Sequence, residues 1–154
     1  MLKLSKKIDY GLIAMNYIAS TDDHASVNTK RIADEYHIPV ELLAKVLQRL
    51  AKRGLIVSHN GPKGGYVLAR PATAITVSEI IEAIEGPVML TACSFGGDGE
   101  SMCDQWGWCS VRSPLHKIQD GIRKLLQNMT LAEMSQLSRQ EENLHGVEVS
   151  SLSR

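Results

Sequence analysis

Apolar residues recur every three or four positions along the first fifty residues, which is the spacing of one helix face. The first set predicts a helix over residues 5–20 and comprises Ile8, Leu12, Met15 and Ala19. A polar stretch ends this helix. A second, short helix then begins at Asn28 or Thr29, either of which can cap it, and ends before Pro39.

Residues 40–53 carry the clearest helical pattern in the chain. One face of this predicted helix is apolar and consists of Leu43, Val46, Leu47 and Leu50. The opposite face carries long polar side chains, namely Lys45, Gln48, Arg49 and Lys52. Gly54 then supplies the stop. We therefore expect the apolar face to pack on the domain and the polar face to stay exposed.

Two short strands follow the third helix, with the sequences LIVSH and GYVLAR. The segment NGPKGG between them is rich in glycine and proline, which is typical of a tight turn. Three helices followed by a hairpin predict a winged helix-turn-helix over residues 1–72. The expected fold class is therefore mainly α with a small β-hairpin wing.

The second half of the chain is again helical in pattern. The segment ITVSEIIEAIEG predicts an amphipathic helix that starts near Thr76 or Ser78 and stops at Gly86. A long helix is predicted from Pro114, a residue favoured in a first turn, to about Asn128. Its apolar positions are Leu115, Ile118, Ile122, Leu125 and Met129. Their heptad spacing favours a dimerisation helix, and the alternative is packing against its own domain.

Three parts are expected after the winged domain. Residues 73–112 form a connecting helix and a cysteine-bearing loop, residues 113–138 form the dimerisation helix and a short terminal helix, and residues 139–154 form a flexible polar tail. No apolar run approaches the roughly 20 residues of a membrane span. The N-terminus also lacks the pattern of a secretory signal. We therefore expect a cytoplasmic protein without a membrane partner.

The formal net charge of zero hides an asymmetry along the chain. Residues 1–72 carry 11 Lys and Arg against 6 Asp and Glu, whereas residues 73–154 carry 6 against 11. A basic N-terminal half favours a polyanionic partner, although surface charge also segregates without function. Together with the winged fold it predicts binding to double-stranded DNA, with the helix at 40–53 in the major groove.

The expected DNA contacts come from the start of the second helix, the exposed side of the third, and the hairpin turn. The residues are Lys30, Val40, Glu41, Lys45, Gln48, Arg49, Asn60, Gly61, Pro62, Lys63 and Gly64. Amides at the start of a helix can grip a phosphate, and a thin turn can enter the minor groove or follow the backbone. A solvated helix face and an ordinary turn are the structural alternatives. A dimer would read a palindromic operator with half-sites about one or two helical turns apart.

The chain has three cysteines, Cys93, Cys103 and Cys109, in one glycine-rich loop. In a reducing compartment such clusters more often bind metal or do redox work than form disulfides. Gaps of nine and five residues lack the close pair of a structural zinc site and favour an iron–sulfur cluster. Trp106 and Trp108 can shield such a centre or pack on the dimerisation helix. Zinc or a switch made of free thiols is the alternative. Because the sequence shows no nucleophile–base pair, we do not expect an enzyme.

Four segments of the chain carry a family resemblance. They are MLKLSKKIDYG, LLAKVLQRLAKRGLIVSHNGPKGGYVLARP, ITVSEIIEAIEGPVMLTAC and LQNMTLAEM. Over residues 1–136 the chain resembles the IscR/NsrR/RirA type of bacterial winged-helix regulators, most closely those of SUF-system iron–sulfur assembly. The resemblance implies a homodimeric transcription factor that holds a [2Fe–2S] or [4Fe–4S] cluster through the three cysteines. It also implies a repressor of iron–sulfur assembly genes that senses cluster, iron or redox status.

Two departures from the family pattern bear on the cluster ligands. The first cysteine gap is nine residues where many relatives have five, and the segment Ser110–Arg112 lacks the histidine that follows the third cysteine in IscR-like members. Asp9 stands at an acidic position that serves as a ligand in some members, reached across the dimer. We expect Asp9 as the fourth ligand, and the alternatives are His116, an exogenous thiol, water or another side chain. Asn60 replaces an arginine common in relatives, which weakens minor-groove reading or shifts it to Lys63.

Overall fold

The computed structural model describes residues 3–21, 26–61, 64–91, 104–105 and 107–140. Its first helices are α1 (Lys6–Ser20), α2 (Thr29–Glu35) and α3 (Val40–Lys52). They are followed by the strands β1 (Ile56–His59) and β2 (Gly65–Leu68). The remaining elements are the 3-10 helix η1 (Ala72–Ala74), α4 (Val77–Glu85) and α5 (Arg112–Asn128), and residues 131–140 are also helical.

Local sequence explains where the helices begin. The Asn28 side chain accepts a hydrogen bond from the Arg31 amide at 2.8 Å, so Asn28 and not Thr29 caps α2. Thr76 caps α4 in a reciprocal box with Glu79, which settles the choice between Thr76 and Ser78. The long helix α5 begins at Arg112, two residues before the predicted Pro114. The separate helix at 131–140 reaches into the segment predicted to be a flexible tail.

An ion pair ties the end of the wing to the start of α4. The Arg70 guanidinium donates to the Glu79 carboxylate at 2.8 Å and to the Ala74 carbonyl at 3.1 Å. Partial burial raises the pKa of Glu79. The hydrogen bonds from Arg70 and Thr76, together with the Arg70 charge, lower this pKa by a larger amount. The net pKa of Glu79 therefore lies below its usual value.

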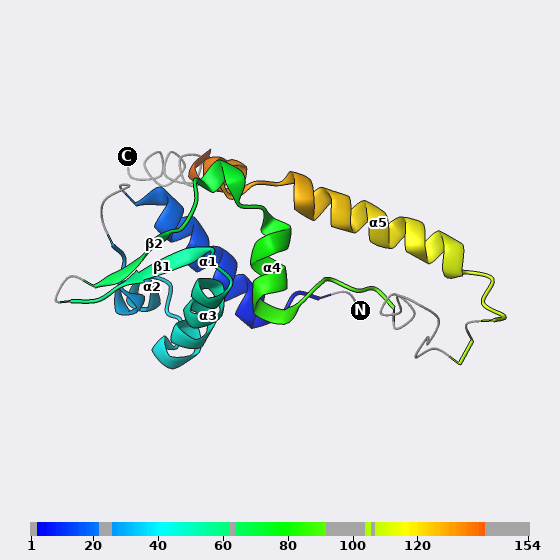
Figure 1. Cartoon of the computed structure of the whole chain (residues 1–154), viewed down its shortest axis with the longest axis horizontal. Coiled ribbons are helices and arrows are strands. Elements are labelled where there is room, and N and C mark those ends of the chain that lie inside the picture. The colour runs from blue at the N-terminus through cyan, green and yellow to red at the C-terminus, as the bar shows by residue number, and fades with distance from the viewer. Residues whose placement is uncertain (1–2, 22–25, 62–63, 92–103, 106, 141–154) are drawn as a thin grey trace, which may run out of the picture.

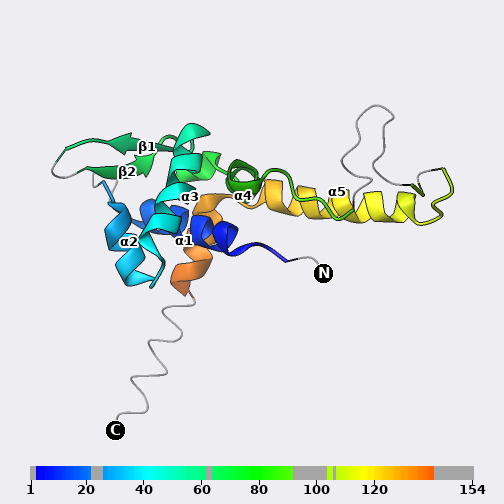
Figure 2. The ribbon, with the colours of Figure 1, turned by 90° about the horizontal axis from the view of Figure 1, so that it is seen from below.

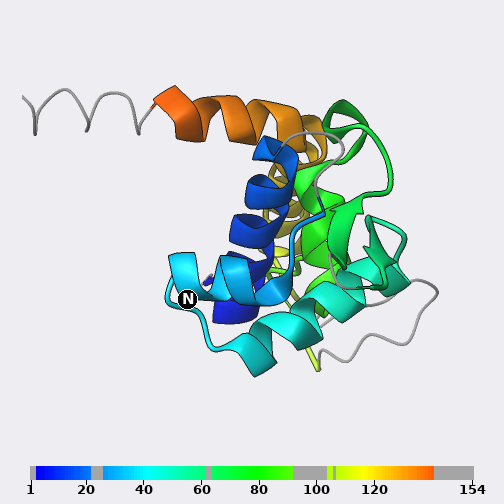
Figure 3. The ribbon, with the colours of Figure 1, turned by 90° about the vertical axis from the view of Figure 1, so that its left-hand side faces the viewer.

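The turn between α2 and α3 depends on a left-handed residue. His37 has a φ of +52°, and it is the one non-glycine residue with positive φ in the part of the chain that the structure describes. Histidine tolerates this region better than β-branched residues do. The next residue, Ile38, is buried and anchors the turn in the core. Helices α2 and α3 consequently lie side by side along one edge of the body (Figure 3).

The predicted apolar face of α3 is the centre of the core. Its four residues Leu43, Val46, Leu47 and Leu50 are all buried. Helix α1 packs against both α3 and α4. Gly11 permits this approach, because a Cβ there would lie 3.3 Å from a Val46 methyl and would collide with the Ile84 side chain. The N-terminal helices and α4 therefore form one packed body.

The strands β1 and β2 form the predicted antiparallel hairpin, in a register that pairs Ile56 with Leu68 and His59 with Gly65. Reciprocal backbone hydrogen bonds between Val27 and Tyr66, of 3.0 and 2.8 Å, fix the hairpin to the segment before α2. The hairpin and the N-terminal end of α5 lie at opposite ends of the long axis of the molecule, as two perpendicular views show (Figure 1, Figure 2). The winged-helix fold with a long C-terminal helix is thus confirmed.

Candidate DNA-reading surface and metal-ligand loop

The polar face of α3 is exposed along its length. The predicted contact residues Val40, Glu41, Lys45, Gln48 and Arg49 all lie on the accessible side, opposite the buried stripe. Val40 is 45% exposed in the first turn, which is an unusual place for an apolar side chain in water. A helix with one buried face and long donors on the other can enter a major groove.

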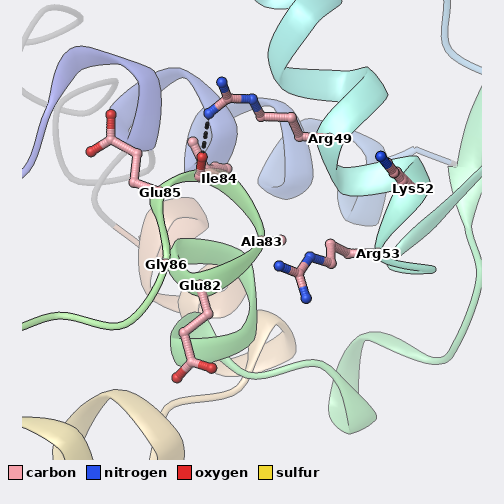
Figure 4. Close-up of a pocket in the computed structure, with 8 residues that line it drawn as sticks. All are labelled: Arg49, Lys52, Arg53, Glu82, Ala83, Ile84, Glu85 and Gly86. Carbon is pink, nitrogen blue, oxygen red and sulfur yellow. Dashed lines mark hydrogen bonds between the residues drawn. The ribbon is translucent and has the colours of Figure 1, made fainter. Parts of the chain in front are cut away.

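Arg49 differs from the other residues on this face because it has a partner inside the protein. Its guanidinium donates a hydrogen bond to the backbone carbonyl of Ile84, in the last turn of α4. Figure 4 shows this bond, with Arg53 on the same side of α3 and Glu82 on the facing helix. Carbonyls at a helix C-terminus lack intrahelical partners, so a cation here stabilises α4. No pattern in the sequence indicates this contact.

Lys30 lies exposed in the first turn of α2, close to the hairpin end of the molecule. The neighbouring Arg31 packs its guanidinium over the Tyr17 ring, 5.7 Å from the ring centroid. Tyr17 also contacts Tyr36 edge-to-face, with ring centroids 5.9 Å apart. Arg31 therefore connects α2 to α1, while the predicted contact of the exposed Lys30 with a phosphate stays a prediction.

The predicted wing tip is partly described. Asn60 and Gly61 are exposed, and Gly61 has a φ of +122°, which favours glycine. A Cβ on Gly64 would lie 2.6 Å from the His59 carbonyl oxygen, so the turn is too tight for a larger residue. Pro62 and Lys63 lie outside the described residues.

Cys109 is the cysteine that the structure describes, and it is a free, half-buried thiol. It lies three residues before α5 begins, so a rigid helix follows it directly. Cys93, Cys103 and Trp106 lie outside the described residues. Trp108 is 89% exposed and therefore does not pack on α5 within this chain. Among the described residues no group of three or more potential ligands gathers at one point.

The two candidates for the fourth ligand occupy different parts of the molecule. Asp9 is exposed in the first turn of α1, within the body. His116 is half-buried near the start of α5. The start of α5 points away from α1 in both perpendicular views (Figure 1, Figure 2). His116 follows Cys109 by seven residues in the sequence, whereas Asp9 belongs to α1, which lies away from the start of α5.

The predicted heptad positions of α5 and its C-cap share one stripe but differ in exposure. Leu115 and Ile122 are half-buried, whereas Ile118, Leu125 and Met129 are 53%, 72% and 42% exposed. The exposed apolar face continues into the next helix, where Leu137 is 52% exposed. A groove lined by Leu125, Met129 and Leu137 runs along it. The residue of α5 that is fully buried is Gln119, a polar residue that the sequence pattern did not select.

The molecule combines a winged helix, whose third helix has an exposed basic face, with a cysteine segment and a projecting amphipathic helix. This combination is that of a winged-helix transcriptional regulator. The chain belongs to the Rrf2 family, described as "Iron-dependent Transcriptional regulator", whose pattern matches residues 4–136. It is 30% identical over 133 residues to the HTH-type transcriptional regulator IscR of Escherichia coli, covering 86% of this chain and 80% of that protein. The family resemblance seen in the sequence is thereby confirmed, and these relatives are regulators of transcription, not enzymes.

Solved structures of two kinds of regulator share the fold. IscR of T. potens is 32% identical with a TM-score of 0.69, covering 92% of this chain and 90% of that one. CymR of B. subtilis, titled "the Global Cysteine Regulator", is 28% identical with a TM-score of 0.70, covering 89% and 98%. The oxidized form of Staphylococcus aureus CymR is 28% identical with a TM-score of 0.67, covering 87% and 96%. No helix in the described part of the chain is long and apolar enough to cross a bilayer.

Proposed function

We propose that this protein is a homodimeric, cytoplasmic repressor whose DNA affinity depends on an iron–sulfur cluster held by Cys93, Cys103 and Cys109. The observation that carries the proposal is that all three cysteines of the chain lie between α4 and α5, in a family described as iron-dependent. Thiolates are the ligands that such clusters use, and a [2Fe–2S] or [4Fe–4S] centre, when bound, supplies oxygen-sensitive redox chemistry. The half-buried Cys109 thiol, three residues before the rigid helix α5, fits this ligand set.

We further propose that the fourth ligand is Asp9 of a second copy. Within one chain the start of α5 lies away from α1, which supports a ligand from α1 of a second copy (Figure 1). His116, seven residues after Cys109 in the same chain, is the alternative. Native mass spectrometry of the anaerobic protein distinguishes them. Loss of the cluster in Asp9→Ala but not in His116→Ala supports Asp9, and the reverse result overturns it.

The exposed face of α5 supports the homodimer. Apolar side chains that line one groove, such as Leu125 and Met129, are rarely left in water by a monomer. A second copy of the same helix presents the same apolar face, which is what a two-fold interface requires. Such a dimer would place two copies of α3 on a palindromic operator, and the proposed targets are iron–sulfur assembly genes.

A second candidate function is a thiol- or zinc-based redox switch on the same winged fold. The observation that favours it is the similarity to CymR, one structure of which is an oxidized form. Free thiols or a zinc–thiolate site would respond to oxidants without iron.

Anaerobic purification followed by metal and sulfide analysis separates the two candidates. We expect a coloured protein that contains iron and acid-labile sulfide, and operator affinities that differ by about tenfold or more between cluster-loaded and cluster-free forms. A colourless protein with zinc would support the second candidate. Equal affinities of the two forms would refute control of DNA binding by the cluster.

A further inference from the structure

We propose that Gln119 is a positioning residue for the cysteine segment: its side chain fixes residues 88–90 against α5 and so sets the separation of the two flanks of that segment. The inference rests on the proposed role of the three cysteines as one ligand set. It adds a residue, Gln119, that holds the backbone before Cys93 close to the helix that follows Cys109. No sequence motif identifies Gln119, because an isolated glutamine on a predicted amphipathic helix usually faces solvent.

Burial distinguishes Gln119 from the rest of its helix. It is 2% exposed, while no other residue of α5 is buried. Both polar atoms of its amide are used. The oxygen accepts a hydrogen bond from the Leu90 amide at 2.8 Å, and the nitrogen donates to the Val88 carbonyl at 2.6 Å. The side chain thus pairs with a donor and an acceptor two residues apart, as the edge of a neighbouring strand would.

The chemistry of this pair requires glutamine. Glutamate of the same length keeps the acceptor for Leu90 but places a second acceptor against the Val88 carbonyl. Methionine has nearly the same shape and can satisfy neither backbone group. Because the partners are part-buried, an unmatched group costs more than the lost hydrogen bond alone. The contact therefore requires a donor opposite Val88 and an acceptor opposite Leu90, and not only a side chain of the right length.

The placement of Gln119 relates it to both flanks of the cysteine segment. Leu90 precedes Cys93 by three residues, and Cys109 precedes the first residue of α5 by three. Gln119 lies seven residues into α5, which at 1.5 Å per residue is roughly 10 Å along the helix axis. The residues after Cys109 therefore continue directly into α5, and the residues before Cys93 are hydrogen-bonded to the same helix through the Gln119 amide.

Without this contact the segment would be anchored further back, at the end of α4. Gly86 ends that helix with a φ of +91°, and the chain then runs beside α5 to Leu90 (Figure 1, Figure 2). A longer, less constrained loop has a larger entropic cost of bringing its ends together. Gln119 accordingly raises the effective concentration of the first thiol near the third before any metal binds.

The test measures that effective concentration in the metal-free, full-length protein. In a Cys103→Ser background, Cys93 and Cys109 are equilibrated with glutathione, so that two protein thiols and one oxidised glutathione give one protein disulfide and two reduced glutathiones. The variants are Gln119→Met and Gln119→Glu. The control is Gln127→Met, which changes an exposed glutamine two turns further along the same helix. Amide hydrogen exchange at Leu90 reports whether the backbone contact is lost.

Gln119→Met removes the acceptor of the Leu90 amide, and in Gln119→Glu the repulsion between the carboxylate and the Val88 carbonyl opens the pair, so both variants are expected to lose protection at Leu90. The backbone that links the anchored positions to the two thiols then lengthens from six residues to ten, which lowers the equilibrium constant about twofold, while Gln127→Met changes neither quantity. A folded Gln119 variant that loses protection but keeps the equilibrium constant would overturn the positioning role, since Gln119 would then serve stability alone. Retained protection at Leu90 would overturn the contact itself. If Gln119→Met does not fold, Gln119→Glu decides. Absence of iron and sulfide from the anaerobic native protein would refute the proposed function and leave this measurement valid.

Discussion

Replacing Arg49 by methionine separates its observed contact with α4 from its predicted role in DNA binding. The guanidinium donates to the Ile84 carbonyl at the end of α4, and it also lies on the exposed face of α3 that is expected to read DNA. Methionine keeps most of the apolar stem but removes the charge and the donors. The matched variant is Lys45→Met, which removes a charge from the same face of α3 without breaking the bond to Ile84.

The expected loss of stability follows from one hydrogen bond with a charged donor. Such bonds contribute about 1.5–3 kcal/mol, and the exposed position of Arg49 reduces this to roughly 1 kcal/mol. For a chain of 154 residues, that loss lowers the melting temperature by about 2–4 °C. Ile84 lines a surface pocket between α3 and α4, where water can bind its carbonyl in place of the guanidinium, so a larger loss is not expected.

The assay combines thermal unfolding with operator binding at several salt concentrations. Both variants are expected to weaken binding and to reduce the slope of log K against log salt by about 1, which is the signature of one lost phosphate contact. Only Arg49→Met is expected to melt earlier. A melting temperature equal to that of the native protein would refute the stabilising role of the bond to Ile84. A native salt slope in Arg49→Met would instead remove Arg49 from the DNA-reading surface.

Three further changes test other parts of the structure. Gly65→Ala would place a methyl group 2.5 Å from the Val27 carbonyl carbon, so urea unfolding should show a loss of roughly 2 kcal/mol; an unchanged midpoint would contradict the close contact. Leu125→Glu puts a charge on the exposed face of α5, and sedimentation should then find monomers, whereas a stable dimer would exclude this face as the interface. The pKa of Glu79 is lower in the folded than in the unfolded protein, where it is near 4.5. The pair of Glu79 with Arg70 therefore stabilises the protein fully at pH values above the unfolded pKa. This contribution is lost as the pH falls through the folded pKa. Glu79→Gln should therefore flatten the acid side of the stability curve, and an unaltered curve would show that the pair contributes nothing.

The elements of the winged domain were predictable because their signals are local. The stripe from Leu43 to Leu50, the cap at Asn28 and the stop at Gly54 each depend on residues within two turns of one another. The hairpin was also predictable from the sequence, because the conformation of its turn requires glycine at positions such as Gly61 and Gly64. The exposed face of α3 then followed from the same period that placed its buried face.

The candidate metal site was predictable only as a set of residues. The count and spacing of the cysteines indicated a ligand loop, but the geometry of ligands that come from distant segments does not follow from spacing. Asp9 and Cys109 lie 100 residues apart in sequence and on separate parts of one chain. Whether they meet depends on how two copies associate, which remains a prediction.

Local sequence is enough to specify the helices, the wing and the face of α3 that stays in water, because hydrophobic periodicity and capping act over a few residues. The packing of the helices determines that Arg49 binds the last turn of α4, that Gln119 is the buried residue of α5, and that the predicted heptad positions differ in exposure. Each of these depends on which backbone group lies opposite a side chain. Arg49 and Ile84 are 35 residues apart, and Gln119 and Leu90 are 29 apart. A contact over such a distance is set by the packing of whole helices and leaves no periodic trace in the sequence.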